Sequence, residues 1–205
     1  MKKFNLTAIK RHVKYNSFKG EIGKIADNVI NRNFVASRPN EKWTTDVTQF
    51  NCPFGKAYLS PILDMYSGDI VSWDLSLSPN FAQTNRMLDR AFRKYKHLDG
   101  LILHSDMGWQ YQHKSYQKRL KDKHIIQSMS RKGNCYDNGI MESFFGTLKN
   151  EMFYTHENEF KTFEDLYKAI KDYIYYYNNK RIKCKTKWMP PAKYRKTSMK
   201  ALDII

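Results

Sequence analysis

The sequence predicts an α/β fold in which a mixed sheet, three antiparallel strands plus two parallel strands, is flanked by helices. Three segments rich in β-branched and aromatic residues are separated by tight turns, which is typical of an antiparallel meander: Lys42–Phe50, Lys56–Met65 and Asp69–Ser76. Further along the chain, a strand, helix, strand order predicts two parallel neighbours, because parallel pairing needs a crossover connection: Leu101–His104, Ser115–Lys123 and Ile125–Met129.

Helices are predicted where apolar residues recur at spacings of three and four. The first such segment follows Ser78-Pro79-Asn80, and its apolar positions are Met87, Leu88, Ala91, Phe92 and Tyr95. A longer one runs from Thr162 to about Asn178. Its tyrosine run, Tyr173–Tyr177, fits packing against a core better than a platform on which bases stack, although both interpretations stay open.

Composition favours one main domain that binds a polyanion. The chain has 205 residues, enough for a single core of ordinary size. It carries 36 Lys and Arg against 20 Asp and Glu, a formal net charge of +16, so nucleic acid is the leading partner. No apolar run approaches the roughly 18 residues that span a bilayer, and no signal peptide opens the chain. The three cysteines lack the spacing of a zinc site, and we expect a cytoplasmic protein that joins the nucleoid when bound to DNA.

The basic charge is concentrated at the two ends. Residues 1–40 hold 9 basic and 2 acidic residues, and the stretch Lys180–Lys200 holds nine basic residues and no acid. We therefore divide the chain into a basic arm at residues 1–36, a core at 37–180 and a basic tail at 181–205. The tail is a candidate surface for backbone phosphates, whereas the arm is equally well interpreted as a solvated segment without function.

Three acids are candidates for the chemistry. Asp46 lies at the centre of the first predicted strand, where an acid either faces solvent or serves a site. Asp106 directly follows the fourth strand, and Glu142 lies in the first turns of a helix that Asp137 or Asn138 could cap. Clustered carboxylates repel one another unless cations neutralise them, and hard oxygen ligands suit Mg²⁺ or Mn²⁺.

Several segments resemble bacterial insertion-sequence transposases of the orfB type, which belong to the superfamily of DDE transposases and retroviral integrases. They lie in order along the chain, and the resemblance covers roughly residues 31–195: Trp43–Thr48, His104–Tyr111, Ser128–Asn138, Met141–Lys149 and Tyr176–Asn178. The family has an integrase catalytic core with a ribonuclease-H-like fold and an Asp, Asp, Glu triad. In that triad 35 residues separate the last two acids, and 35 residues also separate Asp106 from Glu142.

The resemblance implies a metal-dependent DNA transposase that cleaves phosphodiesters and transfers strands. It assigns Asp46, Asp106 and Glu142 as catalytic residues and as ligands of two Mg²⁺ or Mn²⁺ ions. Lys149, seven residues and two helical turns after Glu142, would contact the substrate DNA. We also predict DNA contacts for Arg131 and Lys132. The implied partners are the DNA of the element ends and of the target, further copies of the chain and an upstream-frame protein.

Two departures from the family pattern leave alternatives open. Met107 stands where relatives usually have Gln, outside the triad itself. The family also has a longer N-terminal region that recognises the ends of the element, and this chain begins close to where that region finishes, which leaves recognition of specific ends open. A truncated DNA-binding remnant that cannot transpose, and a ribonuclease-H-like nuclease, remain the competing interpretations.

Overall fold

The computed structural model describes residues 26–131 and 134–201. Most of the predicted basic arm, and Lys132, lie outside these ranges. Within them a six-stranded sheet has the order β2-β3-β1-β5-β6, and β4 also pairs with β3. The strands are β1 (Lys42–Thr45), β2 (Thr48–Cys52), β3 (Gly55–Asp64), β4 (Ile70–Ser76), β5 (Ile102–Ser105) and β6 (Ile126–Met129). β3 is antiparallel to β1, β2 and β4, whereas β1, β5 and β6 run parallel, which confirms the predicted mixed sheet.

The first predicted strand is divided into β1 and β2 at Asp46. Thr45 pairs with Ile62 and Thr48 pairs with Leu59, so one register continues across the gap. This register sets Asp46 opposite Pro61, whose carbonyl accepts a hydrogen bond from Thr45 Oγ1 at 2.8 Å. Because proline has no N–H, the ladder cannot continue on this side. The break frees the backbone around Asp46 from regular strand geometry.

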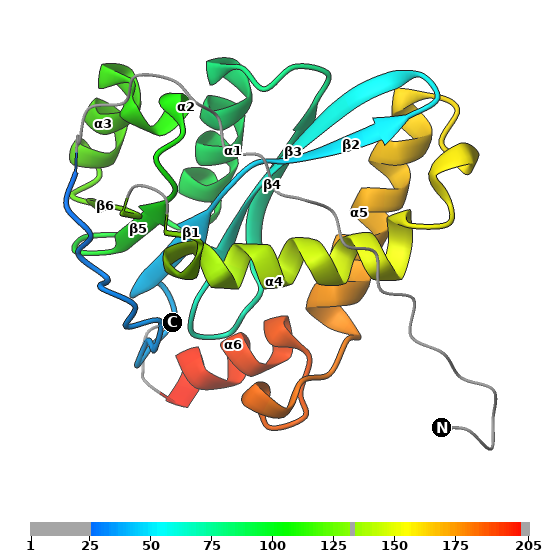
Figure 1. Cartoon of the computed structure of the whole chain (residues 1–205). Coiled ribbons are helices and arrows are strands. Elements are labelled where there is room, and N and C mark those ends of the chain that lie inside the picture. The colour runs from blue at the N-terminus through cyan, green and yellow to red at the C-terminus, as the bar shows by residue number, and fades with distance from the viewer. Residues whose placement is uncertain (1–25, 132–133, 202–205) are drawn as a thin grey trace.

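Helices cover both faces of the sheet (Figure 1). The longer ones are α1 (Phe81–Lys94), α3 (Lys114–Lys121), α4 (Gly139–Leu148), α5 (Phe163–Asn179) and α6 (Pro191–Ala201). The shorter ones are α2 (Trp109–Gln112), η2 (Cys135–Asn138), η3 (Lys149–Phe153), η4 (Glu157–Glu159) and η5 (Cys184–Thr186). Side-chain caps begin three of the longer helices. Asn80 accepts a hydrogen bond from the N–H of Gln83, His113 accepts one from the N–H of Ser115, and Thr162 forms a capping box with Asp165.

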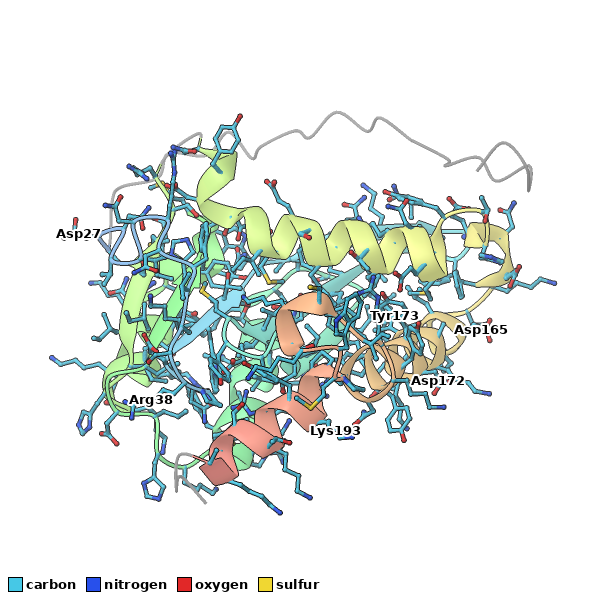
Figure 2. The ribbon with its side chains drawn as sticks, turned by 90° about the horizontal axis from the view of Figure 1, so that it is seen from below. Asp27, Arg38, Asp165, Asp172, Tyr173 and Lys193 are labelled. Carbon is cyan, nitrogen blue, oxygen red and sulfur yellow. The ribbon has the colours of Figure 1, made fainter. Side chains whose placement is uncertain are left out.

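Two hydrophobic clusters lie on opposite faces of the sheet. On one face, α1 and α3 pack on β1 and β5 through Trp43, Met87, Leu88, Leu103 and Leu120. On the other, α4 and α5 pack on β2 and β3 through Phe50, Leu59, Phe144, Leu148 and Ile170. Tyr173 lies on the side of α5 toward α4 and donates a hydrogen bond to Glu151 at 2.9 Å, whereas Asp165 and Asp172 lie on the outer side (Figure 2). The helix that carries Glu142 is therefore held against the sheet by an apolar layer.

The residues before α4 do not cap it as the sequence suggested. Asn138 precedes the helix but accepts no hydrogen bond from its first turn. Its side-chain amide donates instead to Asp46 at 2.7 Å. Asp137 is buried and accepts hydrogen bonds from Arg32 and Arg131. Both side chains are used in tertiary contacts, so that prediction is wrong.

The C-terminal segment packs on the domain through α6. Arg195 is 4% exposed and pairs with Asp64 at 3.0 Å and with Asp69 at 2.9 Å, both at the turn between β3 and β4. Tyr194 stacks on Tyr66 with ring centroids 5.3 Å apart. Arg195 is therefore an interior cation, and the basic surface predicted for Lys180–Lys200 does not include it. No helix within the described ranges is long and apolar enough to cross a membrane.

Candidate active site

Two of the predicted acids lie side by side at the carboxyl ends of two inner strands of the sheet. β1 and β5 are parallel neighbours in which Thr45 pairs with Ser105. Asp46 and Asp106 are the next residue on each strand, so both follow the carboxyl ends of adjacent strands. Asp46 accepts hydrogen bonds from the N–H of Val47 and from the amide of Asn138, each at 2.7 Å.

The turn after β5 closes tightly around Asp106. The N–H of Gly108 donates to Asp106 Oδ1 at 2.9 Å. A Cβ at Gly108 would come within 2.9 Å of that same oxygen and within 2.6 Å of Gln110 Nε2. A side chain at this position would displace the ends of the Asp106 and Gln110 side chains, so glycine allows the carboxylate to approach the backbone closely.

Glu142 is the third predicted acid, and it is supplied by α4, not by a strand. It lies in the first turn of α4, and its side chain is exposed. Asn138, one turn earlier, binds Asp46 and so fixes the start of α4 beside the strand edge. A helix N-terminus carries partial positive charge, which favours an acid in its first turn.

The three acids share one electrostatic environment. Burial raises the pKa of Asp46 well above its ordinary value, and the charges of Asp106 and Glu142 raise it further. Burial also raises the pKa of Asp106. Within the described ranges, no three acidic, histidine or cysteine side chains are arranged to hold one metal ion as they stand. Glu142 is exposed, whereas burial acts on both aspartates.

Lys149 ends α4 on the side that faces β2. Its ammonium donates to the carbonyl of Gln49 at 2.9 Å and lies 5.3 Å from the ring centre of Phe50. Burial lowers the pKa of Lys149, whereas the charge of Asp46 raises it. The charge of Asp46 thus acts on the ammonium, and the contact of Lys149 with DNA stays a prediction.

Of the other two predicted DNA contacts, the structure describes Arg131. Its guanidinium pairs with Asp137 at 2.9 Å, and its N–H donates to the same carboxylate at 3.0 Å. These contacts hold the pKa of Asp137 well below its usual range. A phosphate would therefore have to share Arg131 with Asp137.

Sequence reasoning missed a buried histidine that supports the site. His104 lies on β5 two residues before Asp106, and its ring nitrogens contact Ser128 Oγ at 2.9 Å and the carbonyl of Asp137 at 3.0 Å. It connects β5, β6 and the turn before α4, which carry or flank the acids. The only signal in the sequence is its place in the segment that ends at Asp106.

Comparisons with known proteins show the family to which the chain belongs. Two family models, both described as integrase core domain, match residues 36–135 and 142–199. An uncharacterized transposase-like protein of Haemophilus influenzae is 53% identical over 188 residues, which cover 91% of this chain and 85% of the relative. The chain belongs to the insertion-sequence transposases with an integrase core. These are polynucleotidyl transferases of DNA recombination, so the resemblance in the sequence is confirmed.

A second relative is longer than this transposase chain. The putative transposase InsK for insertion sequence element IS150, from Escherichia coli K12, is 48% identical over 182 residues. That match covers 89% of this chain and 64% of InsK. The chain therefore spans about two thirds of the length of this relative.

Solved structures confirm the fold of this transposase. The HTLV-2 integrase catalytic core domain in complex with magnesium, in its trimeric form, superposes with a TM-score of 0.62 at 19% identity, covering 78% of this chain and 99% of that one. The catalytic core domain of BIV integrase gives 0.61 at 18% identity, covering 79% and 97%. The mixed sheet with helices on both faces is therefore the ribonuclease-H-like fold of retroviral integrase cores.

Proposed function

We propose that this transposase catalyses metal-dependent cleavage of a DNA phosphodiester, followed by direct attack of the freed 3′-hydroxyl on a second strand. Asp46, Asp106 and Glu142 are the proposed catalytic triad and the ligands of two Mg²⁺ or Mn²⁺ ions. The observation that carries the proposal is the position of Asp46 and Asp106 after paired residues on adjacent parallel strands. Glu142 supports it because its charge acts on the same aspartate.

The residues fit a pair of divalent cations. Three carboxylates supply hard oxygen ligands, and the pKa of Asp46 is raised because its charge is buried near two others. A bound cation would relieve that repulsion. When bound, the ions would activate water and stabilise the attacking and leaving oxygens of the phosphodiester. The magnesium in the HTLV-2 integrase complex is consistent with this choice of metal.

The remaining roles are positional. Lys149, at the end of the helix that carries Glu142, would hold a phosphate next to the reacting one and align the DNA end. Arg131 and Lys132 would contact the backbone beside the site. We further propose that the chain works on DNA as an oligomer, which the trimeric and dimeric forms of the HTLV-2 integrase catalytic core domain support. An upstream-frame partner remains part of the proposal.

The decisive experiment measures strand transfer and DNA binding together. The chain is incubated with Mn²⁺, a pre-cleaved element end and a plasmid, alongside Asp46→Asn, Asp106→Asn and Glu142→Gln. Each substitution keeps the size of the side chain and removes one charge, so transfer should be lost while DNA binding stays nearly unchanged. The matched control is Asp172→Asn, which alters an exposed acid on α5 and should retain full activity.

Three outcomes would contradict the proposal. Strand transfer that survives in any of the three variants would make that acid a structural residue. Cleavage of an RNA–DNA hybrid without any strand transfer would favour a nuclease of the same fold. DNA binding without either reaction, in a folded chain with Mn²⁺, would favour the binding remnant.

A further inference from the structure

A cavity lined by basic side chains lies beside α4, apart from the candidate active site. The cavity has a volume of about 570 Å³ and opens between this helix, the turn that joins β3 to β4 and the segment that follows α5. In Figure 1 the last of these is the orange loop below α4. Gly139, Ile140 and Ser143 of α4 line the cavity, and Ser143 directly follows Glu142 in the chain.

Three cations and no acid line this cavity: Arg181, Lys183 and Lys185. Lys183 donates a hydrogen bond to the hydroxyl of Tyr177, and its ammonium lies 4.0 Å from the centre of that ring. Lys185 donates to the carbonyl of Met65 at 3.0 Å. Only Arg181 has a carboxylate partner there, Glu151 at 2.8 Å. Neither lysine forms a salt bridge with any carboxylate that the structure describes.

The charge of Lys183 is poorly compensated. Burial lowers its pKa to about 8 and the positive charges of Arg181 and Lys185 lower it further, whereas the negative charges of Asp69 and Glu151 offset only part of this shift. Arg195, in the same C-terminal segment, is more deeply buried but pairs with two aspartates. Arg195 is therefore neutralised by carboxylates of the domain, whereas Lys183 has no such direct ion pair among the described residues. Lys183 is half-buried and forms no direct ion pair with a described carboxylate, so a bound anion would offset part of the free-energy cost of its burial.

We propose that this cavity binds a backbone phosphate of the DNA strand that leads to the catalytic acids. The proposal rests on the proposed function, because it takes DNA as the substrate. A phosphodiester supplies negative charge, and the half-buried apolar side chains of Phe34 and Ile140 offer a surface for the adjoining sugar. A second copy of the chain is disfavoured as occupant, because it too carries a net charge of +16.

The test combines lysine footprinting with the salt dependence of DNA binding. Exposed amines of the full chain are acetylated in the absence of DNA, with a duplex oligonucleotide, or with inorganic phosphate, and acetylation at Lys183 and Lys185 is measured by mass spectrometry. Affinity for the same duplex is measured from 50 to 200 mM salt for Lys183→Gln and Lys185→Gln. Lys171→Gln is the matched control, since Lys171 is exposed on α5 and does not line the cavity.

Duplex DNA should protect both lysines, and inorganic phosphate should protect them far less. Each cavity variant should reduce the slope of log affinity against log salt by about 0.9, which makes the loss of affinity over this salt range roughly 3.5-fold smaller. The control variant should keep the slope of the parent. Lys185→Gln serves if Lys183→Gln unfolds, because the Lys185 side chain is exposed.

Equal acetylation with and without DNA, or cavity variants with the slope of Lys171→Gln, would overturn the proposal. Protection by inorganic phosphate but not by DNA would also overturn it, because the site would then bind a free anion. Protection by DNA in a chain that transfers no strands would support the cavity and count against the proposed reaction alone. The two proposals therefore fail separately.

Discussion

Replacing Arg195 by alanine tests whether the C-terminal helix is part of the domain. The guanidinium pairs with Asp64 and Asp69 at 3.0 and 2.9 Å, and the three residues are between 0 and 4% exposed. It also lies 4.5 Å from the ring centre of Tyr95. Arg195→Ala leaves two buried carboxylates without their cation, so the fold should lose stability although no catalytic group is touched.

The size of the loss follows from the burial of the network. Removing one partner of a buried ion pair costs about 3–5 kcal/mol, because the remaining charge is left uncompensated. For a domain of this size each kcal/mol shifts the melting temperature by about 2–4 °C, so a decrease of roughly 6–20 °C is expected. A solvent-exposed arginine would shift it by far less, since exposed ion pairs contribute about 0–1 kcal/mol.

Thermal unfolding followed by circular dichroism measures this difference. The matched control is Lys196→Ala, which removes an exposed cation from the neighbouring position of α6 and should change stability by no more than about 0.5 kcal/mol. Equal melting temperatures for the two variants would refute the reasoning. Arg195 would then be an ordinary basic residue of a surface tail.

Three further predictions concern the candidate active site. The raised pKa of Asp46 means that the metal-free folded chain binds a proton more tightly than the unfolded chain, so stability falls as pH rises from 3.8 through the raised pKa. Asp46→Asn should remove this pH-dependent fall in stability. In thermal melts at pH 7 the variant should also lose the stabilisation by Mn²⁺, and a variant that melts like the parent in both measurements would contradict the prediction. Gly108→Ala should keep the fold but displace Asp106, so strand transfer falls at least tenfold while the melting temperature changes little; full activity would refute this. Lys149→Ala should slow strand transfer and Lys149→Glu should slow it more, whereas Lys149→Arg should keep much of the activity; equal rates at low salt would make Lys149 a surface charge.

Local patterns in the sequence were enough to predict most of the elements. Alternation and turn residues located the meander, and helical spacing located α1 and α5, which begin directly after Asn80 and Thr162. Asp106 follows β5 and Glu142 begins α4, as their neighbours in the chain indicate. These features depend on residues within a few positions of one another, so the sequence contains the information directly. The family, too, was readable from motifs that are short and continuous.

Only the tertiary structure decided how these parts meet. The break at Asp46 depends on Pro61 in the opposite strand, and Asn138 holds Asp46 across 92 residues of sequence instead of capping its helix. Arg195 left the predicted basic surface because two aspartates, one of them 126 residues earlier, form a buried site for it. In the last two cases a polar side chain binds a partner that is distant in the sequence, where it could instead have faced solvent or capped its own helix. Local propensity cannot make that choice, because the free energy comes from burial and pairing that exist only once the chain has folded.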